Sequence, residues 1–391
     1  MKRSICFALL GGLAAAIPAA GQDRFAFATL ENGLSVGFAL VRTARSESAT
    51  SIADVALVRS NFVSRVLVDR ESGAFFGYRL SAERAGAGRV RVAFQALPSS
   101  IEGDLRRSPP CADCPPPTRL DAATPRFPAT QVLGDGEVLS LELLANPATG
   151  ERILDVVKVS FQPVTGESLR PAVERTLEAW RIGERAAVFI ARKDHKGALT
   201  EYQKALALTP RDAGLHNRMG MCYQHLDQEK AARQEYEQAL ALNPRYAEVW
   251  NNLGALEQAA RRLGPAVRAY RKALEIKPTM ATAWKNLGSA YLTDGKVEQG
   301  LDAYRRAYEL DPAVLESRGG AVTSGIDAAT VDFFLAKMFA ANGQAEMALE
   351  FLIKAEAAGF RDWNRVGRDH DFDLLGDDPR FRQLLRDGSS H

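Results

Sequence analysis

The sequence predicts a multidomain α and β protein, in which an N-terminal antiparallel, sandwich-like β-domain precedes an α-helical solenoid. Two observations lead to this fold class. Residues from about 179 to 312 repeat themselves at a fixed step of 34 positions, and residues from 23 to about 165 alternate apolar with polar side chains in short runs. A chain of 391 residues, 46% of them hydrophobic, is long enough for each part to bury its own core.

The fixed step appears at four kinds of position. The matching sets are Pro210, Pro244, Pro278 and Pro312; Ala205, Ala239, Ala273 and Ala307; Tyr202, Tyr236, Tyr270 and Tyr304; and Ala198, Ala232 and Ala266, with Gly300 in the fourth place. Within one copy, Gly254 and Ala266 are small where two helices must approach closely, and Tyr270 fills the space beside them. Pro278 then ends the second helix, because proline lacks the amide donor and clashes with the preceding turn.

Together with Trp250, Leu253 and Gly254 earlier in the copy, these positions resemble the tetratricopeptide repeat family. The resemblance implies pairs of antiparallel helices that stack on one another, and at least about three pairs are needed to bury a continuous core. Residues 169–312 match four repeats, entered through a lead-in helix that begins at Pro171.

The period breaks after Pro312. A loop at 313–325, rich in Gly, Ser and Thr, is followed at 326–391 by a fifth, divergent unit in which Leu335, Ala348 and Leu352 keep the helical spacing. The last segment resembles the closing helix of many tetratricopeptide repeat proteins. We expect this C-terminal capping helix to cover the apolar face that an open array end exposes.

Residues 22–168 form the predicted β-domain. Runs such as Arg89 to Ala96 and Leu139 to Leu143 alternate with period two, and turn signals such as Glu31-Asn32-Gly33 separate them. This pattern is typical of an antiparallel sandwich of about eight strands. A proline-rich loop near 98–128 interrupts the domain.

The first 21 residues have the pattern of an export signal. Lys2-Arg3 supply the positive start, an almost entirely apolar run follows from Ile5, and Ala19-Ala20-Gly21 offer small residues for cleavage before Gln22. The alternative is an uncleaved anchor, since an apolar run of about 16 residues is near the short limit for spanning a bilayer. We expect cleavage of this signal peptide (1–21) and a periplasmic or envelope-associated protein without a membrane span.

Export changes the interpretation of the cysteines. In an oxidising compartment, Cys111 and Cys114 in the proline-rich loop are expected to form a local disulfide. The surrounding prolines argue against a thioredoxin-like redox motif, and Cys222 is expected to be a small buried packing residue.

The sequence contains no constellation for catalysis. The β-domain has no histidine to act as a base and no Gly-x-Ser-x-Gly elbow, and the five histidines of the chain form no metal-binding spacing. The net charge of +2 shows no bias toward nucleic acid. We therefore predict a protein that is not an enzyme, with no cofactor, no metal and no nucleic-acid partner.

The resemblance also implies a groove for a protein or an extended peptide, lined by the first helix of each repeat. The groove positions carried over are Asn217, Arg218, Met221 and Gln224 in the second repeat, Asn251, Asn252, Ala255 and Gln258 in the third, and Lys285, Asn286, Ser289 and Leu292 in the fourth. Amide side chains suit main-chain binding because they both donate and accept hydrogen bonds. Lys285 and Arg218 are candidates for a carboxylate clamp, although Gly183 and Asn251 depart from that pattern.

These observations predict an exported scaffold or interaction protein that binds a protein partner through the repeat groove. The alternative is a β-domain that binds a small molecule or glycan and is presented by the repeats.

Overall fold

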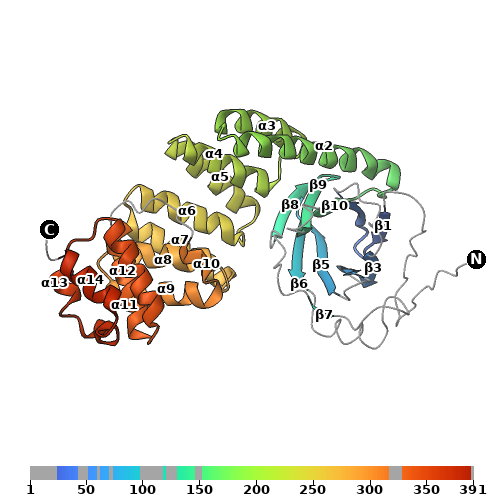
Figure 1. Cartoon of the computed structure of the whole chain (residues 1–391). Helices are drawn as coiled ribbons and strands as arrows, with labels where there is room; N and C mark the ends of the chain where they lie inside the picture. The colour runs from blue at the N-terminus through green and yellow to red at the C-terminus, as the bar shows by residue number, and fades with distance from the viewer. Residues whose placement is uncertain are drawn as a thin grey trace, which may run out of the picture. The chain divides into compact units, whose positions relative to one another are not determined.

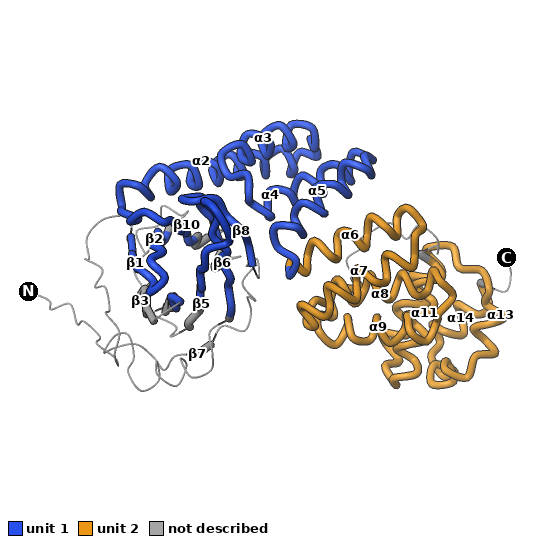
Figure 2. Tube along the Cα trace, turned by 180° about the vertical axis from the view of Figure 1, so that it is seen from behind, with its two compact units in different colours: residues 1–245 blue, residues 246–391 orange. Residues whose placement is uncertain are grey.

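The computed structural model describes residues 24–42, 52–59, 62–69, 74–96, 118–119, 130–145, 152–316 and 328–388 (Figure 1). The predicted signal peptide, the predicted disulfide between Cys111 and Cys114 and the loop residues 317–325 lie outside the described residues. The chain divides into two compact units, Met1–Arg245 and Tyr246–His391 (Figure 2). The division therefore falls inside the repeat array, and the β-domain belongs to the same unit as the first two repeats.

Among the described residues of the first unit, ten strands form two sheets. The four-stranded sheet has the order β1-β2-β10-β9, and the larger sheet the order β3-β4-β5-β6-β8, with the two-residue β7 beside β5. The bounds are β1 Arg24–Thr29, β2 Ser35–Arg42, β3 Ile52–Arg59, β4 Phe62–Asp69, β5 Ala74–Arg84, β6 Arg89–Ala96, β7 Thr118–Arg119, β8 Thr130–Gly134, β9 Val138–Ala145 and β10 Arg152–Ser160. All pairs are antiparallel except β5–β7. The predicted sandwich is confirmed, with two strands more than expected.

The core of the sandwich lies between the two sheets. Phe38 of β2 and Val157 of β10 pack with Leu80 of β5 and Val92 of β6 in one buried cluster. A hydrogen bond also crosses the core, because the Tyr78 hydroxyl of β5 donates to Asp155 Oδ2 of β10 at 2.7 Å and both side chains are fully buried. The period-two alternation of the sequence thus places apolar side chains on the inner faces.

Helix α2 (Gly166–Ala191) covers the outer face of the four-stranded sheet (Figure 1). Ala39 of β2 and Val156 of β10 face away from the sandwich core and pack against Leu169 and Val173 of α2. The predicted start of this helix at Pro171 is wrong. It begins at Gly166, because Thr165 and Ser168 form a capping box that satisfies amide groups of the first turn.

The repeats follow as antiparallel helix pairs. In the first unit, α2 pairs with α3 (His195–Leu208) and α4 (Ala213–His225) with α5 (Glu229–Leu242). In the second unit, α6 (Ala247–Ala259) pairs with α7 (Leu263–Ile276), α8 (Ala281–Thr293) with α9 (Val297–Leu310), and α11 (Ala328–Ala341) with α12 (Ala345–Ala357). A short helix, α10 (Ala313–Glu316), packs against α8 and α9.

The close approach within each pair follows from the small residue of the first helix. A side chain on Gly220, Gly254 or Gly288 would collide with the tyrosine that follows 16 positions later, at 2.5, 2.6 and 2.9 Å respectively. The tyrosines are Tyr236, Tyr270 and Tyr304. The predicted role of glycine and tyrosine as complementary packing partners is confirmed.

The C-terminal segment closes the second unit with three short helices instead of the single one expected. These are α13 (Trp363–Val366), the 3₁₀ helix η1 (His370–Leu375) and α14 (Pro379–Gly388). Phe372 of η1 packs near Phe333 of α11, and Lys337 of α11 pairs with Asp369 at 2.5 Å and Asp371 at 3.0 Å. This segment therefore covers apolar surface of the fifth helix pair, as a cap is expected to do.

Candidate functional site on the first-helix face of the repeats

The groove positions lie on the first helices of the repeats: α2 and α4 in the first unit, and α6 and α8 in the second. We call this surface the first-helix face and describe it separately for each unit. The step of 34 also places three residues of the first repeat on this face: Gly183, Ala187 and Ile190, which correspond to Asn217, Met221 and Gln224 of the second repeat. The groove residues predicted from the sequence do not include Ala187 and Ile190, although the same step marks them.

In the first unit, this face carries exposed apolar side chains. Met221 of α4 is 43% exposed and Ile190 of α2 is 37% exposed, and Ala187 is exposed as well. Val188 of α2 is 51% exposed as well, whereas Met219 of α4 is buried. The two helices adjoin on this face, since a Cβ added to Gly183 would lie 3.6 Å from the Arg218 guanidinium.

The polar groove residues of the first unit differ in their burial and in the hydrogen bonds and ion pairs that they form. The Gln224 side chain accepts a hydrogen bond from the Tyr236 hydroxyl at 2.9 Å, and Asn217 is buried. Arg218 is partly exposed and pairs with no carboxylate among the described residues. The first unit therefore presents an uncompensated positive charge beside exposed apolar surface.

In the second unit, the groove residues bond to one another. Asn286 Nδ2 of α8 donates to Asn251 Oδ1 of α6 at 3.0 Å, and Gln258 Nε2 of α6 donates to Ser289 Oγ of α8 at 3.0 Å. The Tyr270 hydroxyl donates a hydrogen bond to the side-chain oxygen of Gln258, Oε1, at 2.9 Å. The Asn286–Asn251 and Gln258–Ser289 bonds join consecutive repeats, so these amide groups stabilise the stacking of the helix pairs.

Lys285 and Asn252 complete the set of groove residues in the second unit. Lys285 Nζ donates to the backbone carbonyl of Val314 at 3.0 Å, and burial lowers the pKa of its ammonium group. Asn252 is half-buried and also has a partner, while Ala255 and Leu292 are buried. Lys285 is therefore directed to α10, and Arg218 belongs to the other unit, so neither unit by itself brings the two candidate clamp cations together.

Among the described residues, no group of three His, Cys, Asp or Glu side chains is arranged to hold a metal ion. Cys222 is free and buried behind the first-helix face, and burial raises the pKa of its thiol to about 11. A thiol with this pKa stays protonated at neutral pH, which agrees with its predicted packing role. Over the same part of the chain, no helix combines the length and apolar character needed to cross a bilayer.

Comparison with solved structures finds repeat proteins. PilF of Pseudomonas aeruginosa is 18% identical over 56% of this chain and 91% of its own, with a TM-score of 0.41. MamA residues 41 to the end, from Desulfovibrio magneticus RS-1, is 19% identical over 49% of this chain and 97% of its own, with a TM-score of 0.35. YrrB, described as a protein with an unusual peptide-binding site, is 19% identical over 54% and 91%, with a TM-score of 0.33.

The comparison with curated proteins gave no match. Two sequence profiles of the tetratricopeptide repeat match the chain, one at residues 189–256 and the other at residues 256–314. These matches coincide with the helix pairs from the end of α2 to α9 and with the glycine–tyrosine packing inside them. The repeat region of this chain belongs to the tetratricopeptide repeat family.

Proposed function

We propose that this chain is an exported, non-enzymatic scaffold that binds an extended peptide segment of a protein partner in the cell envelope. The binding surface is the first-helix face of α2 and α4. The observation that carries the proposal is the exposure of Met221 and Ile190, two large apolar side chains on the first helices of the first two repeats, with Arg218 on the same face. Exposed apolar side chains that adjoin a free cation are typical of a recognition surface.

The charge on this face indicates the chemistry of the peptide. Arg218 is partly exposed, has no acidic partner among the described residues, and its guanidinium lies beside Gly183 of α2. A carboxylate placed there gains a charge-assisted hydrogen bond, whereas a lysine or arginine is repelled. The proposed ligand therefore carries an acidic residue close to an apolar one that packs on Met221.

Met221→Glu is expected to weaken partner binding at least about tenfold, because burial of a methionine side chain on binding contributes roughly 1.5–3 kcal/mol. Ile353→Glu is the matched control: Ile353 on α12 is also 43% exposed, but it lies on the second helix of its pair. Each protein would be expressed in cells, crosslinked and affinity-purified, with circular dichroism to confirm folding.

Loss of a partner from Met221→Glu alone supports the proposal, and Arg218→Glu is expected to lose the same partner. A partner that is retained by Met221→Glu, or lost equally from Ile353→Glu, contradicts it. Absence of any partner from the wild-type protein contradicts it as well.

The export part of the proposal is supported by the charged, apolar and small-residue order of the first 21 residues. Mass spectrometry of the purified protein is expected to find Gln22 as the mature N-terminus, in the envelope fraction. An intact Met1 in the cytoplasmic fraction contradicts export, and an intact Met1 in the membrane fraction indicates the retained anchor.

A further inference from the structure

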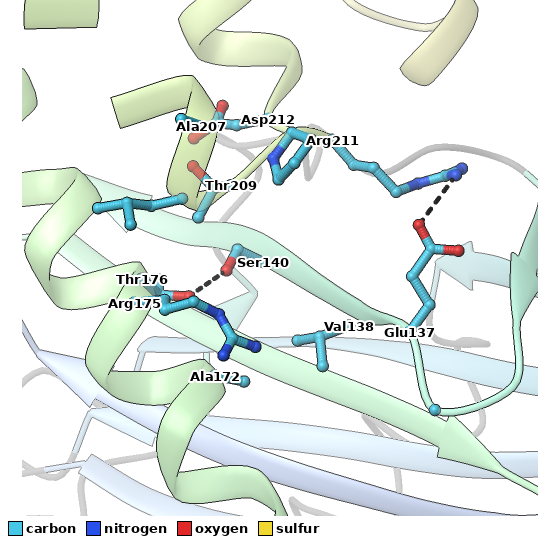
Figure 3. Close-up of a pocket in the computed structure, with 13 residues that line it drawn as sticks. Glu137, Val138, Ser140, Ala172, Arg175, Thr176, Ala207, Thr209, Arg211 and Asp212 are labelled. Carbon is cyan, nitrogen blue, oxygen red and sulfur yellow. Dashed lines mark hydrogen bonds and ion pairs between the residues drawn. The ribbon is translucent and has the colours of Figure 1, made fainter. Parts of the chain in front are cut away.

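A pocket of about 380 Å³ opens in the first unit, between the β-domain and the first two repeats (Figure 3). Its walls come from the turn before β9 and the start of β9, from one side of α2, and from the segment that joins α3 to α4. Pockets that hold small molecules are commonly about 300–1,000 Å³ in volume and lie where domains meet. The volume and position of this pocket fit a small ligand.

The acidic side chains of the lining are already engaged. Glu137 accepts a hydrogen bond from Arg211 at 3.3 Å and one from a backbone N–H at 2.8 Å. Asp212 caps α4, because its side chain accepts hydrogen bonds from two backbone N–H groups in the first turn of that helix. Arg211 is engaged too, since its Nε and Nη2 both donate to Gln131 Oε1, at 3.2 and 2.6 Å.

Arg175 of α2 is the lining charge that stays uncompensated. It is exposed, it pairs with no acidic side chain of the described residues, and Figure 3 shows its guanidinium reaching from α2 toward Val138. An anion is favoured beside Arg175, because Glu137 is paired with Arg211, Asp212 is held by backbone N–H groups, and the Arg175 guanidinium has no acidic partner among the described residues.

Two further features restrict the ligand. Ser140 Oγ and Thr176 Oγ1 lie 2.8 Å apart in the lining, so one hydroxyl donates to the other and a second hydroxyl hydrogen remains for a ligand. Val138 and Ala172 supply apolar surface beside the Arg175 guanidinium. A ligand that fits has an acidic head group and an apolar body.

We propose that this pocket binds a small organic carboxylate, whose head group pairs with Arg175 and with the Ser140–Thr176 hydroxyl pair while its apolar body lies on Val138 and Ala172. The site is separate from the first-helix face and does not depend on the peptide-binding proposal. Because β9, α2 and the α3–α4 segment all contribute, a bound carboxylate also stabilises the contact between the β-domain and the repeats.

The test is saturation-transfer NMR on the mature full-length protein, with benzoate, octanoate and acetate as probes. Benzamide, which has the shape of benzoate without its charge, and inorganic phosphate, which has charge without an apolar body, are the comparison probes. We expect saturation transfer to benzoate or octanoate, and at least tenfold weaker binding of acetate, benzamide and phosphate.

Arg175→Gln is expected to weaken carboxylate binding at least tenfold. Arg181→Gln is the matched control, because Arg181 is an exposed arginine of the same helix that does not line the pocket. Unchanged melting temperatures of both variants without probe establish that they fold. Absence of binding to every carboxylate, equal binding of benzamide, preference for phosphate, or full binding by Arg175→Gln overturns the proposal.

Discussion

Gly254→Leu is expected to destabilise the second unit by about 3 kcal/mol, because overpacking a filled core forces side chains and backbone out of place. A Cβ at Gly254 already lies 2.6 Å from Tyr270 Cε1 and 2.7 Å from Cδ1. The Tyr270 ring is fully buried, and its hydroxyl is bonded to Gln258. The ring therefore cannot withdraw without breaking its hydrogen bond to Gln258, the residue that also bonds to Ser289 of the next repeat.

Gly264→Leu is the matched control for this change. A Cβ there approaches only the end of the flexible Arg268 side chain, at 3.6 Å, and the position is exposed at the start of α7. The same substitution is expected to stay within about 0.5 kcal/mol of the wild type. Urea unfolding followed by tryptophan fluorescence reports mainly on this unit, since it contains Trp250, Trp284 and Trp363 of the four tryptophans. Equal midpoints for both variants contradict the packing account.

Tyr78→Phe is expected to cost about 2 kcal/mol in the β-domain, because a buried carboxylate loses a donor that no solvent replaces. The ring is retained, so no cavity forms. What changes is the 2.7 Å hydrogen bond to Asp155, which links β5 in one sheet to β10 in the other. Faster amide exchange in peptides from both strands, measured by mass spectrometry, is the expected result.

Tyr223→Phe serves as the control for Tyr78→Phe. Tyr223 is partly buried in the first unit, and none of its described contacts is a hydrogen bond from its hydroxyl. Its substitution is expected to leave exchange in β5 and β10 unchanged. If Tyr78→Phe also leaves amide exchange in β5 and β10 unchanged, the hydrogen bond across the sandwich does not hold the two sheets together.

The helix pairs could be predicted from sequence because their packing depends on local pairs of residues at a fixed step. Glycine at 220 or 254 and the tyrosine 16 positions later can be recognised in the sequence itself. The alternating apolar and polar runs likewise predict the sandwich. The sequence misplaces the start of α2, because Pro171 is itself a favoured residue of a first helical turn, whereas the reciprocal hydrogen bonds of Thr165 and Ser168 set the actual first turn.

The contacts between the β-domain and the first two repeats could not be predicted from the sequence. They join residues far apart in sequence: Gln131 of β8 donates to the Leu242 carbonyl of α5 at 2.5 Å and accepts from Arg211. No periodicity marks such residues. The pocket between β9 and α2 could not be predicted for the same reason.

The groove residues show a further limit of sequence reasoning. Their positions on the first helices follow from the repeat, but whether a side chain is free depends on its neighbour in the next repeat. Gln258 is bonded to Ser289 and Tyr270, whereas Met221 has no such cover. The side-chain contacts in the folded protein therefore distinguish the residues that join repeats from those that are open to a partner.

The most direct test of the account is site-specific photo-crosslinking in cells, with a photoreactive phenylalanine analogue placed at position 221 or 353. Both positions are equally exposed in the wild type, so reactivity toward bulk protein is matched. The account predicts a discrete crosslinked partner at 221 and none at 353, and loss of that product when Arg218→Glu is added. A partner that crosslinks at 353 and not at 221, or equally at both, contradicts a binding surface on the first-helix face of α2 and α4.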